Sequence, residues 1–209
     1  MHSFSFPRRV VPHAVQVERW GFDGLMLADS QNLNADIWVE LGMAAAATER
    51  IKLGPGVTNP ATRHPAVTAS AAATLQAETG GRAVLGIGRG DSALTQIGRR
   101  PVPVAELERA VVAIQCYLSG KEVDSEGVRS RIGWIPSAQD LPKVPVRVAA
   151  SGPRVIAMAA EHADGIDLTV GAEEERLRWA LQMAQPSGDA ASSVGAFLNV
   201  AVHPDRGVA

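Results

Sequence analysis

The residues best suited to chemistry follow short apolar segments, where strands are expected to end. Asp29 comes directly after the apolar segment 23–28. Thr58 and Asn59 come directly after segment 51–57, which is interrupted by glycine and proline. The carboxyl ends of parallel strands meet at one edge of a sheet, and α/β proteins bind their ligands there. The pattern therefore predicts a binding site built from several loops.

Two later turns are suited to an anion. Ser151 and Gly152 end an apolar segment and precede an expected helix, and Val170 and Gly171 end the next one. The free backbone N–H groups at a helix N-terminus favour a phosphate, and barrels often build phosphate sites from late loops. A plain short turn remains the alternative interpretation of each.

The run 86–91 (GIGRGD) begins like a dinucleotide-binding fingerprint. That fingerprint requires a third, correctly spaced glycine and a helix that opens directly after the loop. The spacing is wrong, and we expect no helix directly after Asp91. We therefore reject a Rossmann site and treat Gly88 and Arg89 as residues of a different kind of loop.

His64 has two possible roles. It lies directly before Pro65, which is expected to begin a helix. A histidine there can cap the helix, or it can act as a general acid. The five histidines share no ligand spacing, so no metal site is predicted.

Composition restricts the class of protein. The 209 residues are 46% hydrophobic and 20% charged, with a net charge of -2, which is typical of a globular domain. Without a basic run, and with 4% aromatic residues, nucleic acid is not expected as a partner. No apolar run reaches the length of a membrane span. Because Cys116 is the single cysteine, no internal disulfide can form, and we expect a cytoplasmic protein.

Apolar segments alternate with amphipathic ones along the chain, which predicts a parallel α/β sheet. An irregular excursion, with short strands expected around 128–134, interrupts this alternation at about 120–143, and we expect a single domain over 1–209. A closed barrel typically needs about 250 residues, so the pattern alone permits an open sheet or a barrel cut short. The expected strands are 3–6, 23–28, 51–57, 82–87, 145–150, 165–170 and 196–202, and the expected helices are 7–21 (after Pro12), 36–48, 65–79, 103–118, 155–163 and 173–185.

Three of these helices carry more specific expectations. Asp36 is expected to cap helix 36–48. One face of helix 65–79 is expected to consist of Val67, Ala71, Thr74, Leu75 and Glu78. Helix 103–118 is expected to have an apolar stripe at steps of four, three and four, formed by Leu107, Val111, Ile114 and Leu118.

Four segments carry a family resemblance: DGLMLADS, the block 53–92, VRVAASGPR and ADGIDLTVGA. They resemble the luciferase-like superfamily of flavin-dependent oxidoreductases, and most closely its branch that uses the deazaflavin coenzyme F420, typified by methylenetetrahydromethanopterin reductase. The resemblance implies a TIM (β/α)8-type barrel with an excursion after the fourth strand. It also implies that this barrel is incomplete at its C-terminus, with about seven strands present.

The resemblance also implies roles for individual residues. Asp29 would be an acid near the reactive part of the ring, although Ser30 stands where the family often has histidine. A bulge at Gly56 and Val57, with a peptide that is sometimes cis, would back the central ring. The cofactor-binding residues implied are Asp29, Gly56, Val57, Thr58, Asn59, Gly88, Arg89, Ser151, Gly152, Val170 and Gly171, with Asp29 and His64 as catalytic candidates.

Three functions are compatible with these observations. The first is an F420-dependent oxidoreductase that moves a hydride between the coenzyme and a small organic substrate. The resemblance implies a homodimer for it, because dimers are common in the family. The second is an FMN-dependent monooxygenase of the same superfamily. The third is a non-catalytic barrel fragment.

Overall fold

A parallel sheet forms the centre of the computed structural model, which describes residues 1–135, 140–185, 193–205 and 207. β1, β2 and β3 pair in that order, and so do β4, β7, β8 and β9. Two isolated parallel bridges, Leu53 to Ala83 and Thr58 to Ile87, join the two groups between β3 and β4. The strands are β1 (His2–Ser3), β2 (Gly24–Leu27), β3 (Lys52–Pro55), β4 (Leu85–Ile87), β7 (Val146–Ala150), β8 (Gly165–Leu168) and β9 (Ser193–Ala196).

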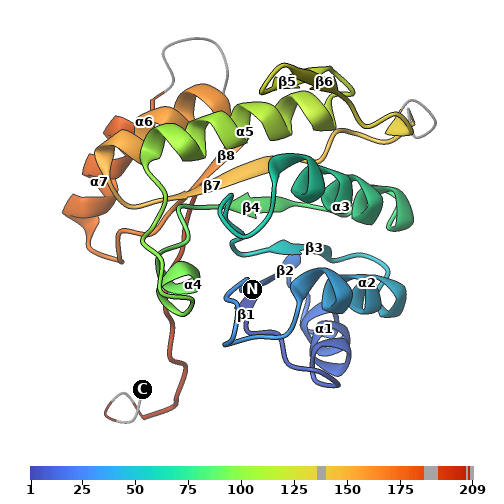
Figure 1. Ribbon diagram of the computed structural model, residues 1–209. Coiled ribbons are helices and arrows are strands. Elements are labelled where there is room, and N and C mark those ends of the chain that lie inside the picture. The colour runs from blue at the N-terminus through green and yellow to red at the C-terminus, as the bar shows by residue number, and fades with distance from the viewer. Residues whose placement is uncertain (136–139, 186–192, 206, 208–209) are drawn as a thin grey trace.

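These seven strands confirm the predicted number and the parallel arrangement. The sheet curves so that its helices lie on the outside (Figure 1). Among the described residues β1 and β9 do not pair with each other, so the curved sheet is of the barrel type but open. The helices are α1 (Val10–Arg19), α2 (Ile37–Ala47), α3 (Pro65–Glu78), α4 (Asp91–Thr95), α5 (Val104–Leu118), α6 (Pro153–His162) and α7 (Glu174–Met183).

Caps and apolar stripes explain why the helices form where they do. The Asp36 side chain accepts hydrogen bonds from the backbone N–H groups of Trp38 and Val39, which fixes the start of α2. α5 has the predicted stripe at steps of four, three and four, and its members are all buried: Leu107, Val111, Ile114 and Leu118.

Several expected boundaries and faces were wrong. α1 begins at Val10, two residues before Pro12, because a proline is tolerated in the first turn, where its missing N–H has no helical partner. In α3 the predicted face included Val67, which is 51% exposed. Small and polar residues such as Ala69 and Ala72 are buried instead, because they let α3 approach its neighbours closely. The last strand is 193–196 rather than 196–202.

The excursion at 120–143 contains a β-hairpin, β5 (Val123–Ser125) and β6 (Val128–Ser130). Glu126 and Gly127 both have positive φ, 54° and 81°, as the two central residues of a type I′ turn do. The predicted strand region at 128–134 is therefore confirmed in part, and residues 136–139 of the excursion lie outside the described residues. In the described part of the chain, no helix is long and apolar enough to cross a membrane.

Candidate active site

A cavity of about 940 Å³ lies at the carboxyl edge of the sheet. This volume is in the usual range for small-molecule sites. All seven parallel strands contribute residues from their carboxyl ends or the loops that follow, as the sequence predicted for this edge. Its lining includes Ser3, Asp29, Gly56, Val57, Gly88, Arg89, Ser151, Gly152, Thr169 and Phe197.

Asp29 is the buried acid of the cavity, with 4% of its surface exposed. The Thr58 hydroxyl donates to its Oδ2 at 2.7 Å, and the Gln31 side-chain amide donates to Oδ1 at 2.7 Å. Burial raises the pKa of this carboxyl above its usual value, and the two hydrogen bonds oppose that shift only in part. A carboxyl group of this kind can hold and release a proton near neutral pH more readily than an exposed one.

Glycine forms one wall of the cavity. The peptide bond between Gly56 and Val57 is cis. A Cβ atom at Gly56 would lie 2.6 Å from the Met26 Cβ and 2.7 Å from His2 Nδ1, so no larger residue fits there. At Gly88 a Cβ would lie 3.0 Å from Val57 Cγ2. The backbone of both loops is therefore accessible to a flat ligand.

The loop after β4 holds Arg89 at the cavity with a hydrogen bond from Nε to the Val102 carbonyl at 2.7 Å. Gly90 has a φ of +82° and caps α4, which begins at Asp91. The expectation that no helix opens after this loop was therefore wrong. α4 has only five residues, because Gln96 ends it and Gly98 follows in a left-handed conformation.

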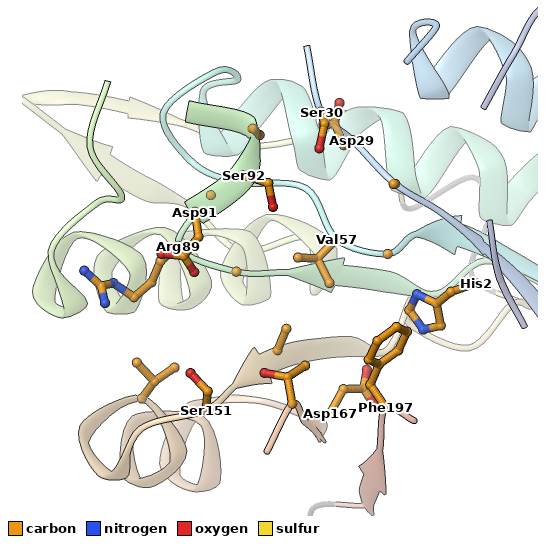
Figure 2. A pocket seen from close by; sticks show the side chains of 18 of the residues that line it. His2, Asp29, Ser30, Val57, Arg89, Asp91, Ser92, Ser151, Asp167 and Phe197 are labelled. Carbon is orange, nitrogen blue, oxygen red and sulfur yellow. The ribbon is translucent and has the colours of Figure 1, made fainter. Parts of the chain in front are cut away.

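The inner end of the cavity carries His2, Asp167 and Phe197 (Figure 2). The rings of His2 and Phe197 meet edge to face, with their centroids 4.9 Å apart. Burial lowers the pKa of His2, and the Asp167 charge opposes this shift in part. Burial therefore favours the neutral form of this imidazole.

The opposite end of the cavity is formed by the start of α6. Gly152 is the N-cap of this helix, and Ser151 and Arg154 line the cavity beside it. Figure 2 shows Ser151 and Arg89 well separated from His2 and Phe197. This end offers backbone N–H donors and positive charge, as the sequence analysis expected for an anion.

Five predicted residues do not line the cavity. His64 is exposed and caps α3, since its Nδ1 accepts the Ala66 N–H at 3.2 Å. Thr58 and Asn59 are fully buried behind the lining, where Thr58 supports Asp29 and Asn59 Oδ1 accepts the backbone N–H groups of Ala61 and Thr62. Val170 and Gly171 follow β8 but do not line the cavity, whereas Thr169, directly before them, does.

Sequence reasoning missed His2, Asp167 and Phe197. One signal could have revealed Asp167: it is a charged residue inside an apolar strand, GIDL, whose other members are buried. His2 and Phe197 carried no such signal, because they approach each other only through the curvature of the sheet. No group of three or more potential metal ligands is present within the described ranges.

A ligand cavity at the carboxyl edge of a curved, parallel α/β sheet defines a barrel-type binding protein, the architecture in which many enzymes place their active sites. The model of the luciferase-like monooxygenase family matches residues 4–209. The chain therefore belongs to the luciferase-like family.

Individual relatives agree with this assignment. The chain is 35% identical over 160 residues to a 5,10-methylenetetrahydromethanopterin reductase of Methanolobus tindarius, covering 76% of this chain and 49% of the relative. It is 34% identical over 203 residues to an F420-dependent glucose-6-phosphate dehydrogenase of Beutenbergia cavernae, covering 89% and 60%. The chain thus spans about half of the first of these relatives and three fifths of the second.

Solved structures show the same fold. The F420-dependent tetrahydromethanopterin reductase of Methanopyrus kandleri superposes with a TM-score of 0.76 and 26% identity, covering 95% of this chain and 64% of that chain. An F420-dependent secondary alcohol dehydrogenase superposes with a TM-score of 0.71 at 18% identity, a likeness of fold alone.

Proposed function

We propose that this protein is an F420-dependent oxidoreductase, which moves a hydride between the deazaflavin coenzyme and a small organic substrate. The observation that carries the proposal is the cavity itself, whose lining combines a buried acid of raised pKa, Asp29, with the glycines Gly56 and Gly88. The names of the relatives, which are F420-dependent enzymes, support the choice of coenzyme.

The residues of the cavity fit such a coenzyme. A flat ring needs a wall with few side chains, and Gly56 and Gly88 both line this cavity. A Cβ atom at either glycine would crowd its neighbours, Met26 at Gly56 and Val57 at Gly88. An anionic tail needs donors, and Ser151, Gly152 and Arg154 provide them at the N-terminus of α6. The predicted second anion-binding turn, Val170 and Gly171, lies outside this lining.

A bound deazaflavin would supply the hydride chemistry, and the protein would supply binding, orientation and proton control. Gly56, Val57 and Gly88 would hold the ring, with Arg89 beside it. Asp29 would keep or release a proton at its carboxyl group, since its pKa is raised by burial. Thr58 and Gln31 would hold that carboxyl group in place through their hydrogen bonds.

The test is a binding titration of the purified chain with F420 and, separately, with FMN, followed by fluorescence quenching. Saturable binding of F420 that weakens in Gly88→Val supports the proposal, because the valine side chain would occupy the wall. Glu161→Gln, on the exposed face of α6, is the matched control and should bind as the wild type does. Binding of FMN alone would favour the monooxygenase alternative, and binding of neither in a folded sample would favour the non-catalytic one.

We also propose a homodimer, joined through the outer face of α2 and α3. Apart from Glu40, which is buried, α2 consists of apolar residues and one glycine, and an apolar helix is usually covered on all sides. Its Val39 and Met43 are 63% and 54% exposed, and Val67 on the adjoining α3 is 51% exposed. The lone Cys116 supports a cytoplasmic location.

A further inference from the structure

An ion pair lies inside the curved sheet, below the inner end of the cavity. The Arg147 guanidinium, on β7, donates from Nε and Nη2 to Asp167 Oδ1, on β8, at 3.0 and 2.7 Å. The same side chain donates from Nη1 to Ser193 Oγ at 2.6 Å and from Nη2 to the Ile166 carbonyl at 3.2 Å. Nε also donates to Asp167 Oδ2 at 3.1 Å, so five contacts hold this guanidinium in one orientation.

Two glycines make room for the pair. A Cβ atom at Gly165, on β8, would lie 2.4 Å from Arg147 Nη1. A Cβ atom at Gly195, on β9, would lie 3.2 Å from Asp167 Oδ1 and 3.4 Å from Arg147 Nη2. The neighbouring strands thus lack side chains at the positions where the ion pair lies.

Stability alone is a weak reason for such a pair. The two side chains are only 23% and 25% exposed, and moving charges out of water costs about as much as their attraction returns. Asp167 reaches the cavity lining, whereas Arg147 lies behind it and does not. The Asp167 carboxylate therefore faces the ligand, and the Arg147 guanidinium holds it from the side away from the cavity.

The charges of the cavity define a direction for the ligand. Arg89, Arg154 and the N-terminus of α6 outweigh the single carboxylate of Asp91 at one end. Asp167 lies at the other end, away from Arg89 (Figure 2). A carboxylate repels a phosphate and accepts from an N–H group. An anionic tail therefore belongs at α6, and the neutral, polar edge of a ring belongs at Asp167.

We infer that Asp167 selects ligands whose ring carries an imide N–H at its inner edge, and that Arg147 is its positioning residue. This inference rests on the proposed function, because the deazaflavin and flavin rings both carry an imide N–H between two carbonyl groups. The Asp167 carboxylate accepts this N–H, and methylation of the ring nitrogen removes the donor.

The test compares the deazaflavin core of F420 with its imide N-methylated derivative. A hydrogen bond to a charged group contributes about 1.5–3 kcal/mol, so the wild type should bind the methylated compound about 10- to 100-fold more weakly. Asp167→Ala should bind the two compounds with nearly equal affinity. Arg147→Met should reduce the preference for the unmethylated compound without weakening the binding of the methylated one. If Arg147 had only a structural role, its loss would weaken the binding of both compounds alike.

The controls keep the two proposals apart. Glu161→Gln should retain the full preference of the wild type. Binding of both compounds by the wild type with equal affinity would overturn the role of Asp167 and leave the proposed coenzyme intact. A preference that persists unchanged in Asp167→Ala would also overturn it. If neither compound nor F420 itself binds the wild type, the proposed function fails, and this inference fails with it.

Discussion

Asp29 illustrates how function and stability oppose each other at a single residue. Its carboxyl group is buried at the cavity, and burial raises its pKa above the value of an unfolded chain. A carboxyl group whose pKa is higher in the folded state favours folding at low pH and loses that contribution as the pH rises through the folded pKa. At neutral pH the ionised Asp29 therefore lowers the free energy of unfolding.

We expect Asp29→Asn to raise the thermal stability at pH 7, by on the order of 2 °C in Tm. Asparagine keeps an acceptor for the Thr58 hydroxyl and removes the buried charge. The gain should vanish at a pH below the unfolded pKa, where Asp29 is protonated in both states. Thermal unfolding of both proteins at pH 7 and pH 3.5 checks this, and a lower Tm of the variant at pH 7 would contradict it.

At the scale of elements, polar side chains fix where helices begin and where strands enter the sheet. His64 starts α3 through its Nδ1, and Glu18 holds the entrance to β3. The Glu18 Oε1 atom accepts the backbone N–H groups of Glu49, Arg50 and Ile51 at 3.0, 2.7 and 3.1 Å. The His64 contact is local to the start of α3, whereas the Glu18 contacts join the end of α1 to the segment before β3, two segments that the pattern of apolar residues alone leaves unconnected.

His64→Ala should destabilise the protein by about 1 kcal/mol, because α3 loses its N-cap. His64→Ser should recover most of this loss, since serine is a good cap. Neither change should alter the affinity for F420, because His64 lies outside the cavity lining. Chemical denaturation and the fluorescence titration measure the two effects, and a loss of binding in both variants would restore His64 as a site residue.

Glu18→Gln should lower the free energy of unfolding at pH 7 by about 1 kcal/mol, a value reduced by solvent screening. Hydrogen bonds from these backbone N–H groups lower the pKa of Glu18, and the bond from the Arg50 N–H has the largest effect. A carboxyl group with a depressed pKa contributes stability above its unfolded pKa and loses it as the pH falls through the folded pKa. The difference between the two proteins should therefore shrink on acidification below pH 4.5, as urea denaturation at a series of pH values would show.

At the scale of the whole molecule, one apolar core connects the helices to the sheet from Val10 to Ala184. We propose on this basis that the chain is a single domain. Its thermal unfolding should be one cooperative transition, because no boundary divides the core. Far-ultraviolet circular dichroism and tryptophan fluorescence should give the same midpoint, and two separate transitions would contradict the proposal.

The proposed homodimer depends on the exposed apolar face of α2 and α3. Val39→Lys should yield monomers, because a charged side chain at the centre of an apolar contact must lose its water. Val128→Lys is the matched control and should leave the dimer intact. Val128 lies on the β-hairpin, outside the proposed interface, and its exposed fraction of 67% is close to the 63% of Val39. Sedimentation velocity distinguishes the two states, and a monomeric wild type would end the proposal.

Much of this architecture was predictable from the sequence, because local patterns reflect local physics. The apolar segments, the stripe of α5 and the Asp36 cap depend on neighbours in the chain, and each was predicted before the structure. Asp29 and Ser151 were predicted as site residues because parallel strands end at one edge, and Gly56 and Gly88 because the family resemblance implied them. All four line the cavity. The buried face of α3 and the end of β9 were not predicted correctly, since packing against distant segments of the chain determines them.

What only the tertiary structure decided is which side chains meet across the cavity. His2 and Phe197 are 195 positions apart in the sequence and lie edge to face because the sheet curves. Arg147 and Asp167 meet through the register of β7 against β8, which pairs Ala149 with Asp167, and through the space at Gly165 and Gly195. A sequence records the residue types of such a site, but strand register and curvature determine the distances between them.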